Sequence, residues 1–314
     1  MRILVTGGAG FIGSHIVDVY RQAGHTVVVV DDLSRGRREN LPADVELVEL
    51  DVRSKELAYV FEEVQPEVVS HHAAQISVAK AVAEPMEDGS VNVLGTVNVL
   101  YQAAEYGAAK VIFASSVAVY GEPDYVPLDE DHDTCPRSPY GASKLAGEVY
   151  VRQFARLSAL EATVFRYGNV YGPRQDAEGE AGVVAIFVQQ MLHGAPTVIH
   201  GDGLQTRDFV YVGDVAEANL LALRAGDGGL FNLGTGRATT VRALWAAVGE
   251  VIGYEGLEIH GSPREGDIRH MVLSAERARR RLGWRPKTSL TEGLRLTAEA
   301  FERSAGARAR PSVA

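Results

Sequence analysis

The sequence predicts an α/β fold in which a doubly wound parallel sheet is followed by a smaller mixed α/β region toward the C-terminus. Short runs rich in β-branched residues alternate with helix-period segments through the first two-thirds of the chain. These runs are almost entirely apolar, which is typical of parallel strands covered by helices on both faces. After Arg166 the alternation loosens into loops rich in Gly, Pro and Asp, with helical segments between them.

Six strands are expected in the first part of the chain, joined by right-handed crossovers. Their ranges are Arg2–Thr6, Thr26–Val30, Val45–Leu50, Glu67–His71, Lys110–Ala114 and Ala162–Arg166. Helical periodicity is clearest in Glu87–Gly107 and Tyr140–Leu157, and it returns in Val183–His193, Val215–Ala225, Thr240–Ile252, Ala275–Leu282 and Leu290–Ser304. Residues 305–314 lack such periodicity and are expected to form a disordered tail.

The composition is typical of a globular protein with a large core and without disulfide bonds. The 314 residues are 46% hydrophobic, enough for a large core, and the net charge of -10 contains no block of like charges. This acidity disfavours nucleic acid or an anionic membrane as the main partner, although a local basic pocket for phosphates stays possible. Cys135 is the single cysteine, which excludes a disulfide framework. With no signal peptide or membrane-length apolar run, we expect a cytoplasmic protein.

A glycine-rich turn follows the first expected strand. The segment VTGGAGFIGSH, Val5–His15, places Gly7, Gly10 and Gly13 at the opening of a helix. Glycines there allow a tight turn and a close approach to a pyrophosphate, whose charge the helix N-terminus favours. A tight strand–helix turn alone could explain them. Their place in a βαβ unit, with an acid at the end of the second strand, indicates a dinucleotide-binding Rossmann fold.

That acid is Asp31, and it bears on the choice of cofactor. A carboxylate in this place accepts hydrogen bonds from the adenosine ribose and repels a 2′-phosphate, so we expect NAD. Three arginines of the following loop, Arg35, Arg37 and Arg38, could instead hold the 2′-phosphate of NADP. Asp51 follows the third strand, where it can meet the adenine or simply cap the next segment.

The stretch SPYGASKLAGE, Ser138–Glu148, places Tyr140 and Lys144 one helical turn apart. Ser138 suits the N-cap and Pro139 the first helical position, so the helix is expected to begin just before Tyr140. At this spacing an ammonium can lie beside a phenol, or both can reach one ligand. An ordinary amphipathic helix with a partly buried Tyr is the plainer explanation when the pair is considered alone.

Taken in order, these motifs resemble the extended short-chain dehydrogenase/reductases, and within them the UDP-glucose 4-epimerases. Beyond the glycine turn, Asp31 and the Tyr–Lys helix, the resemblance extends to about residue 300. It includes HHAA (His71–Ala74), FASSVAVYG (Phe113–Gly121), RYGNVYGPRQD (Arg166–Asp176), GEAGVVAIF (Gly179–Phe187), QTRDFVYVGDVA (Gln205–Ala216), FNLGTG (Phe231–Gly236) and PREGD (Pro263–Asp267).

The resemblance implies a set of site residues. Tyr140 would be the catalytic base and acid, Lys144 its partner, and Ser116 the hydroxyl that orders the sugar and the phenol, with Ser115 as the neighbour that could be confused with it. Expected NAD contacts are Gly7, Gly10, Phe11, Ile12, Gly13, Asp31, Asp32, Asp51, Val52, Ala73, Ala74, Asn92, Tyr140, Lys144 and Tyr167. Expected nucleotide-sugar contacts are Ser116, Asn169, Arg207, Arg264 and Asp267, although each of the last four could be an ordinary loop or surface residue.

The implied activity is C4 epimerisation of a UDP-hexose, with NAD held as a prosthetic group by a homodimeric enzyme. Residues 1–168, with about 207–233, would bind the dinucleotide, and 169–206 with 234–304 the nucleotide sugar. Substrates of the N-acetylhexosamine or uronic acid series remain open, and Met271 is aligned with the position that limits room for an N-acetyl group.

Three rival interpretations are less favoured. A sugar-nucleotide 4,6-dehydratase would carry an Asp–Glu pair where this chain has Val117 and Ala118. A catalytically silent NAD-binding sensor typically loses the Tyr or the Lys. No metal is expected, because the adjacent His71 and His72 would point to opposite faces of their strand.

Overall fold

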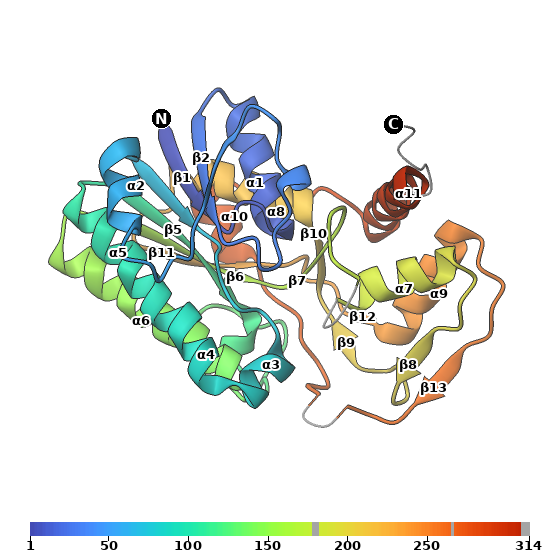
Figure 1. The fold of residues 1–314 in the computed structure, drawn as a ribbon. Coiled ribbons are helices and arrows are strands. Elements are labelled where there is room, and N and C mark those ends of the chain that lie inside the picture. Colours follow the sequence, from blue (N-terminus) through green and yellow to red (C-terminus); the bar gives the residue numbers. More distant parts are fainter. Residues whose placement is uncertain (178–181, 265–266, 309–314) are drawn as a thin grey trace, which may run out of the picture.

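In the computed structural model, which describes residues 1–177, 182–264 and 267–308, seven parallel strands form a central sheet (Figure 1). The spatial order is β11-β6-β5-β4-β1-β2-β3. The order reverses between β1 and β4, which pair directly, so successive crossovers leave the sheet in opposite directions at that point. The strands are β1 (Arg2–Thr6), β2 (Thr26–Asp31), β3 (Glu46–Glu49), β4 (Val68–His71), β5 (Lys110–Ser116), β6 (Glu161–Tyr167) and β11 (Gly229–Leu233).

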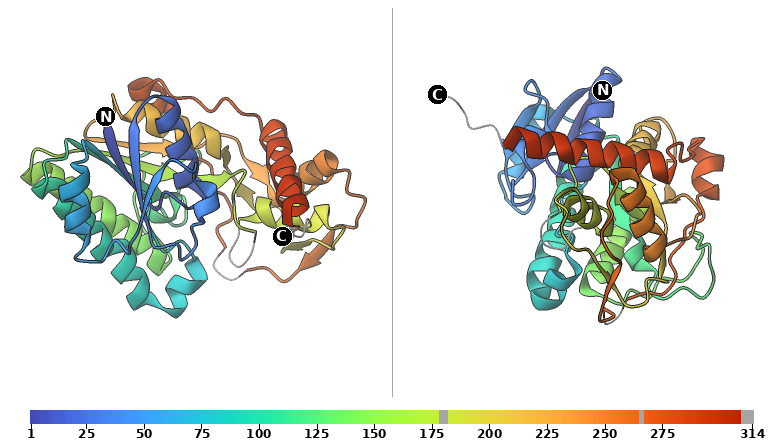
Figure 2. Two further views of the ribbon diagram at one scale, coloured as in Figure 1. Left: turned by 45° about the horizontal axis from the view of Figure 1, so that its top comes forward. Right: turned by 90° about the vertical axis from the view of Figure 1, so that its right-hand side faces the viewer.

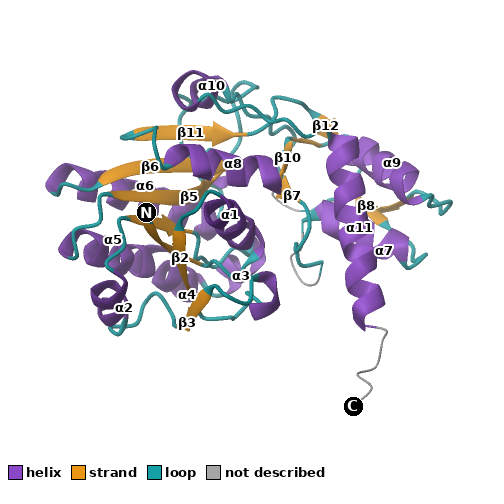
Figure 3. Cartoon of the chain, turned by 90° about the horizontal axis from the view of Figure 1, so that it is seen from above, coloured by secondary structure: helices purple, strands orange, loops and turns teal. Residues whose placement is uncertain are grey.

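Alternate residues of each strand face two separate helical layers (Figure 3). Ile3 and Val5 of β1 join a core with α1 (Phe11–Gln22), α8 (Val212–Ala222) and α10 (Glu276–Leu282). Leu4 joins the opposite core with α2 (Leu57–Val64), α5 (Thr96–Glu105) and α6 (Pro139–Leu157). Burial on both faces is the reason that the inner strands are mostly apolar, as predicted, whereas the edge strand β3 has exposed Glu46 and Glu49 at its ends.

The six predicted strands are confirmed, each with ends within two residues of the expected ones. The seventh strand, β11, was not predicted as a strand. It has only five residues, begins at a glycine and comes directly after a helix and a glycine-rich turn, so no strand alternation stands out. It pairs with β6 from Thr163 to Tyr167 and thus brings the segment near residue 230 back into the sheet.

The predicted helix Glu87–Gly107 is a composite. It consists of α4 (Pro85–Gly89), the π-helical segment η2 (Ser90–Gly95) and α5, and it follows a short helix, α3 (Val78–Ala83). A π segment widens the turn by one residue while the backbone stays helical, so apolar periodicity in the sequence does not reveal it. Such segments often lie at functional sites.

The described residues of the smaller region form three helices and three strand pairs. The helices α7 (Val183–Leu192), α9 (Val241–Ile252) and α11 (Leu290–Arg308) pack together, and Figure 2 shows α11 as the long red helix. The pairs are β7 (Asn169–Tyr171) with β10 (Phe209–Tyr211), β9 (Thr206–Arg207) with β12 (Thr239–Thr240), and β8 (Val198–His200) with β13 (Ile259–Gly261).

Two expected helix boundaries need correction. Helix α8 begins at Val212 and ends at Ala222, three residues earlier than predicted. Helix α11 continues to Arg308, so residues 305–308 of the expected tail are helical, and 309–314 lie outside the described residues. In the part of the chain that the structure describes, no helix is long and apolar enough to cross a membrane.

A fully buried ion pair ties α6 to the sheet. The Arg166 guanidinium of β6 donates to both carboxylate oxygens of Glu148, at 2.8 and 2.7 Å, and Ser115 Oγ donates to the same carboxylate at 2.6 Å. The guanidinium also stacks 4.5 Å from the ring centroid of Tyr120. Because Glu148 has no access to water, its charge depends on Arg166 and Ser115.

Replacing Arg166 by Met is expected to lower the free energy of unfolding by about 3 kcal/mol, because it leaves the Glu148 carboxylate buried without a cation. Denaturant unfolding measures this loss. The control is Arg280→Met, which removes an exposed partner of Glu276 and should cost less than about 0.5 kcal/mol. Equal losses in the two variants would contradict the argument.

Candidate active site

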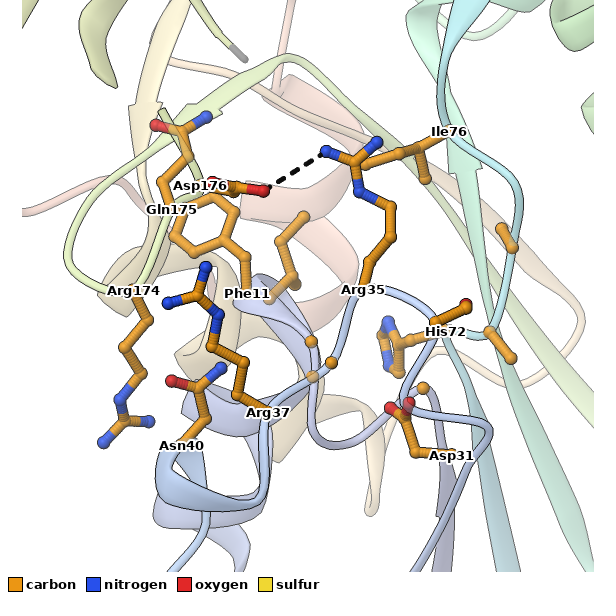
Figure 4. A pocket seen from close by; sticks show the side chains of 18 of the residues that line it. Phe11, Asp31, Arg35, Arg37, Asn40, His72, Ile76, Arg174, Gln175 and Asp176 are labelled. Atoms are coloured by element: carbon orange, nitrogen blue, oxygen red, sulfur yellow. Dashed lines mark hydrogen bonds and ion pairs between the residues drawn. The ribbon is translucent and has the colours of Figure 1, made fainter. Parts of the chain in front are cut away.

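A cavity of about 1650 Å³ lies at the carboxyl ends of the central strands. Its wall includes residues at or just after the ends of six of them: Gly7, Asp31, Asp51, Ala73, Ser115 and Tyr167. The opposite wall comes from the loop that follows β7, with Arg174, Gln175 and Asp176, and from the ends of α7 and α11 (Figure 4). Ligands of doubly wound sheets bind in this place, at the topological switch point.

The glycine turn forms a close-fitting cradle. Gly7 has φ +67°, and a Cβ there would lie 2.5 Å from the Ala73 nitrogen, so the β1 and β4 turns touch through it. A Cβ on Gly13 would lie 2.2 Å from the Gly7 oxygen. Gly10 is the N-cap of α1, whose first turn holds no acidic side chain, and Phe11, Ile12 and Gly13 line the cavity. Free amides at this helix end fit a pyrophosphate.

Asp31 lies at the end of β2 with its carboxylate held by backbone amides. Ala9 N and Leu33 N each donate to it at 2.9 Å, one to each oxygen. Burial raises the pKa of Asp31 above its ordinary value, and these hydrogen bonds oppose that rise. Gly10 also hydrogen-bonds this carboxylate, and a carboxylate has about four acceptor sites, so Asp31 can still accept from a ribose hydroxyl. Asp32, beside it on the cavity wall, accepts from Ser34.

The three loop arginines lie in different surroundings. Arg38 donates to the carbonyl oxygens of Pro42, Ala43 and Val45 at 3.0–3.2 Å, which directs its guanidinium to its own loop. Arg35 reaches across the cavity to Asp176, 3.5 Å away, and Arg37 lines the wall (Figure 4). With Arg38 engaged by carbonyls and Asp31 at the ribose position, the geometry favours NAD over NADP.

Asp51 and Val52 line the cavity as expected, but the Asp51 carboxylate is already engaged. Arg53 Nε and Nη2 donate to it at 2.9 and 2.6 Å, and these hydrogen bonds lower the pKa of Asp51. The carboxylate also accepts from Arg53 N, so it caps a turn six residues before α2, not the helix itself.

Asn92, expected to contact the cofactor, does not line the cavity. It lies in η2, buried, and its Nδ2 is shared between Gln75 O, Asp88 Oδ1 and Ser143 Oγ at 2.9–3.1 Å, while its Oδ1 accepts from Gln75 N. The π segment directs the amide between the β4 turn and α6. Asn92 therefore supports the loop that borders the cavity, and the sequence could not reveal this orientation.

The tyrosine–lysine pair is placed as the sequence predicts. Ser138 Oγ accepts from Gly141 N at 3.1 Å, and α6 begins at Pro139. Lys144 is 5% exposed, and its Nζ donates to Ala114 O at 2.9 Å. Burial lowers the pKa of Lys144 to about 8, opposed by the charge of Asp88. Both Tyr140 and Lys144 line the cavity.

The two neighbouring serines differ in their partners. The Ser116 hydroxyl hydrogen-bonds the Tyr140 phenol, whereas Ser115 donates to Glu148. Burial raises the pKa of Tyr140 above its ordinary value, and the Ser116 hydrogen bond opposes that rise. In the protein alone the phenol is therefore protonated at neutral pH, and only Ser116 has its hydroxyl directed at Tyr140.

The turn after β4 contributes Ala73 and Ala74 to the cavity, together with His72, which was expected to belong to the cofactor-lining turn. The His72 ring stacks on Tyr167 at 6.3 Å between centroids, and its buried Nδ1 has no partner among the described residues. His71 turns the other way and is held by Thr6 and Thr96. Burial lowers the pKa of each histidine to about 3, so both are neutral.

Sequence reasoning also missed the loop Gly172–Ala177 as a wall of the site. His15 Nε2 hydrogen-bonds Pro173 O at 2.9 Å, and Arg174, with φ +66°, forms an ion pair with Asp18 at 2.8 Å. Both partners belong to α1, so the loop is attached over the glycine turn. The GPRQD portion of the RYGNVYGPRQD motif could have indicated that this loop borders the site.

Of the expected nucleotide-sugar residues, Ser116 ends β5, whereas Asn169, Arg207, Arg264 and Asp267 lie in the smaller region. None of the five is part of the cavity wall described above. Arg207 forms an ion pair with Asp267, whose backbone N donates to Arg264 O at 3.3 Å. Asn169 N donates to Asp208 O, and its buried Oδ1 has no partner among the described residues. Met271 is buried with Val119, Tyr120, Leu128 and Leu273.

Two motif segments, residues 179–181 and 265–266, lie outside the described residues. In the rest of the chain, no group of three or more His, Cys, Asp or Glu side chains is arranged to hold a metal ion.

Comparisons with known proteins point to one family. Residues 3–234 match the model of the NAD dependent epimerase/dehydratase family. The putative UDP-glucose 4-epimerase of Methanocaldococcus jannaschii is 48% identical over 294 residues, 93% of this chain and 96% of the relative. A UDP-glucose 4-epimerase from Thermotoga maritima, solved with UDP-glucose, superposes with a TM-score of 0.95 at 48% identity, covering 97% of this chain and 100% of that one. A Thermus thermophilus UDP-glucose 4-epimerase, solved with NAD, gives 0.91 at 46%, covering 96% and 99%.

Gly13→Ala is expected to weaken NAD binding by roughly tenfold or more, because the new methyl group would displace the Gly7 backbone from the cradle. The measurement is a titration of NAD-depleted protein, with circular dichroism to verify folding. Gly249→Ala in α9 is the control, since its Cβ would meet nothing closer than 3.8 Å. Equal affinity in the two variants would show that the cradle does not hold the dinucleotide.

Proposed function

Since the chain belongs to the NAD dependent epimerase/dehydratase family, we propose that its site interconverts the C4 epimers of a UDP-hexose, UDP-glucose and UDP-galactose. The enzyme is an isomerase with NAD as cofactor. The names of its relatives support this substrate. The observation that carries the proposal is that Tyr140, which is hydrogen-bonded to Ser116, and Lys144 line one end of a cavity whose other parts fit a dinucleotide.

Tyr140 acts first as a base and then as an acid. Its phenolate takes the proton of the sugar 4-hydroxyl while C4 loses a hydride, which yields a 4-keto sugar, and Tyr140 later returns the proton. The glycine turn, Asp31 and Lys144 would hold NAD, which would supply a hydride acceptor and donor and, when oxidised, a positive charge. Burial, and to a smaller degree the charge of Asp88, raise the pKa of the Tyr140 phenol above its ordinary value. Ionisation near neutral pH therefore requires more than about 4 kcal/mol from neighbouring positive charges and Ser116.

The remaining expected residues divide between two regions. Residues 1–168, with about 207–233, form the proposed dinucleotide-binding domain, and β11 from the second segment supports that division. Residues 169–206 and 234–304 form the proposed nucleotide-sugar domain. Arg207 and Arg264 supply positive charge for the diphosphate, Asn169 an unpartnered amide oxygen, and Asp267 a carboxylate for the ribose.

Dehydration is the less favoured chemistry. After Ser116, Val117 and Ala118 belong to a single turn of 3₁₀ helix, η3 (Val117–Val119), and neither side chain can move a proton. The elimination of water needs an acid and a base at these positions.

The site residues disfavour a uronic acid substrate more than an N-acetylhexosamine. A uronic acid needs a cation for its carboxylate, but in the RQD loop Asp176 is an acid that faces Arg35. Met271, by contrast, is a flexible side chain in a small cluster, so an N-acetylhexosamine substrate is the second candidate.

The first test incubates the purified protein with UDP-galactose and no added cofactor, and follows UDP-glucose by proton NMR. Conversion is expected, because hydride returned in each cycle leaves NAD oxidised and bound. Absence of conversion, both alone and with NAD supplied, would reject the hexose substrate. UDP-N-acetylgalactosamine in the same assay then tests the second candidate.

Tyr140→Phe is expected to retain NAD and to lose turnover by roughly a thousandfold, since only the proton-transferring oxygen is removed. NAD content and the rate of UDP-galactose conversion are measured on the same preparation. Tyr150→Phe, at an exposed position of the same helix, is the control and should keep its rate. Near-normal turnover in Tyr140→Phe would rule out this mechanism.

We further propose a homodimer, formed through α4–η2–α5 and the neighbouring α6. Their outer surfaces carry large apolar side chains in water, including Met86 and Leu157, which are 86% and 85% exposed, and Leu94, Tyr101 and Val149. A second copy of these helices would bury this surface in a helical bundle.

Light scattering is expected to give about twice the chain mass. Leu94→Glu should yield monomers, because a carboxylate would have to be buried at the interface. Leu257→Glu should remain dimeric, because Leu257 is also exposed to water (81%, against 64% for Leu94) but lies outside these helices. A monomeric wild-type protein would refute the proposal.

A further inference from the structure

Asp88 is a buried acid that the mechanism above does not use. Asp88, in the last turn of α4, is only 1% exposed. Its Oδ1 accepts from Gln75 Nε2 at 2.9 Å and from Asn92 Nδ2 at 3.0 Å. Both donors are neutral amides, and Asp88 forms no ion pair with any described residue. A buried carboxylate without a cation is destabilising by several kcal/mol unless another charge compensates it.

Lys144 is a buried cation without a direct anionic partner among the described residues. Its ammonium is buried against β5, where it donates to one carbonyl oxygen, Ala114 O, and lies 5.3 Å from the ring centroid of Phe113. Within the described chain it has no carboxylate partner at ion-pair distance. Helices α4 and α6 pack against each other, and the negative charge of Asp88 acts on Lys144, raising its pKa against the effect of burial.

A hydrogen-bond chain links the same acid to the start of α6. Asn92 Nδ2, which bonds Asp88, also donates to Ser143 Oγ at 3.1 Å. Ser143 Oγ donates in turn to Tyr140 O at 3.0 Å. These three groups are buried or partly buried, so the backbone of Tyr140 is connected through two side chains to the Asp88 carboxylate.

We propose that Asp88 is a positioning residue for the tyrosine–lysine pair, whose buried carboxylate balances the ammonium of Lys144 and, through Asn92 and Ser143, holds the first turn of α6. It touches neither substrate nor cofactor in this scheme. The importance of the pair rests on the proposed function, whereas the charge balance itself can be tested without any activity.

Other charged groups around the pair do not replace Asp88. On the β4 side, His71 and His72 are neutral, because burial and then the charge of Lys144 lower the pKa of both to about 3. On α6 itself, Glu148 is paired with Arg166. On the neighbouring short helices, Glu87 is paired with Arg53, and Lys80 lies 3.9 Å from Glu84.

Asp88→Asn separates charge from hydrogen bonding, because the amide oxygen can still accept from Gln75 and Asn92. Loss of the carboxylate lowers the pKa of Lys144 below about 8, so Lys144 loses its proton at lower pH. The alkaline limb of the pH profile of kcat/KM for UDP-galactose should therefore move down by about one pH unit. Glu105→Gln, which removes an exposed charge from the far end of α5, should leave the limb in place.

A second measurement needs no turnover. Asp88→Asn is expected to lower the thermal midpoint of the wild-type protein, since it leaves the Lys144 ammonium alone. In a Lys144→Met background the same change should raise the midpoint, because there it removes a carboxylate that has lost its cation.

The two measurements distinguish the failure of the inference from that of the proposed function. An alkaline limb that stays in place, or an equal drop in thermal midpoint in both backgrounds, would overturn the role of Asp88. Absence of epimerisation in the wild-type protein would reject the proposed function and leave the thermal comparison valid.

Discussion

The burial of a parallel sheet on both faces is the constraint from which the rest of this structure follows. Helices occupy each face, so the backbone groups and side chains free to meet a ligand are those at the strand ends. Six strand ends border the cavity, and the order reverses where β1 pairs with β4. The turns after β1 and β4 leave the sheet in opposite directions at that point. Gly7 and Ala73, one from each turn, are in close contact there.

Buried charged side chains have direct partners in the scaffold, whereas near the site two opposite charges lie apart from each other. In the scaffold, Glu148 is paired with Arg166 and also accepts from Ser115. Asp208 accepts four hydrogen bonds, from Thr235 N and Oγ1, Gly236 N and Leu273 N at 2.6–3.1 Å. Lys144 and Asp88 instead carry opposite charges without direct contact between them. A charge that is not neutralised by its nearest neighbour stays available to act on a phenol or a ligand.

The chain crosses between its two regions at the site itself. Tyr167 ends β6 on the cavity wall, and only Gly168 separates it from Asn169, whose amide oxygen is unpartnered in the smaller region. The loop Gly172–Ala177 then returns over the glycine turn, where His15 holds it. The proposed cofactor and sugar sites are therefore joined by a few residues of continuous backbone. A movement of one region would displace the residues of the other at this connection.

The sequence by itself determined the features that depend on neighbours along the chain. These are the six apolar strands, the glycine turn at α1, the cap and start of α6, and the one-turn spacing of Tyr140 and Lys144, because local sterics and hydrogen bonds decide them. Only the tertiary structure decided that Ser116 faces Tyr140 while Ser115 faces Glu148, that Asn92 turns away from the cavity, that β11 joins the sheet, and that Asp88 lies near Lys144. These features depend on segments that lie 24 to 66 residues apart in the sequence. The orientation of Asn92 also depends on a π segment, whose extra residue does not alter the apolar periodicity visibly.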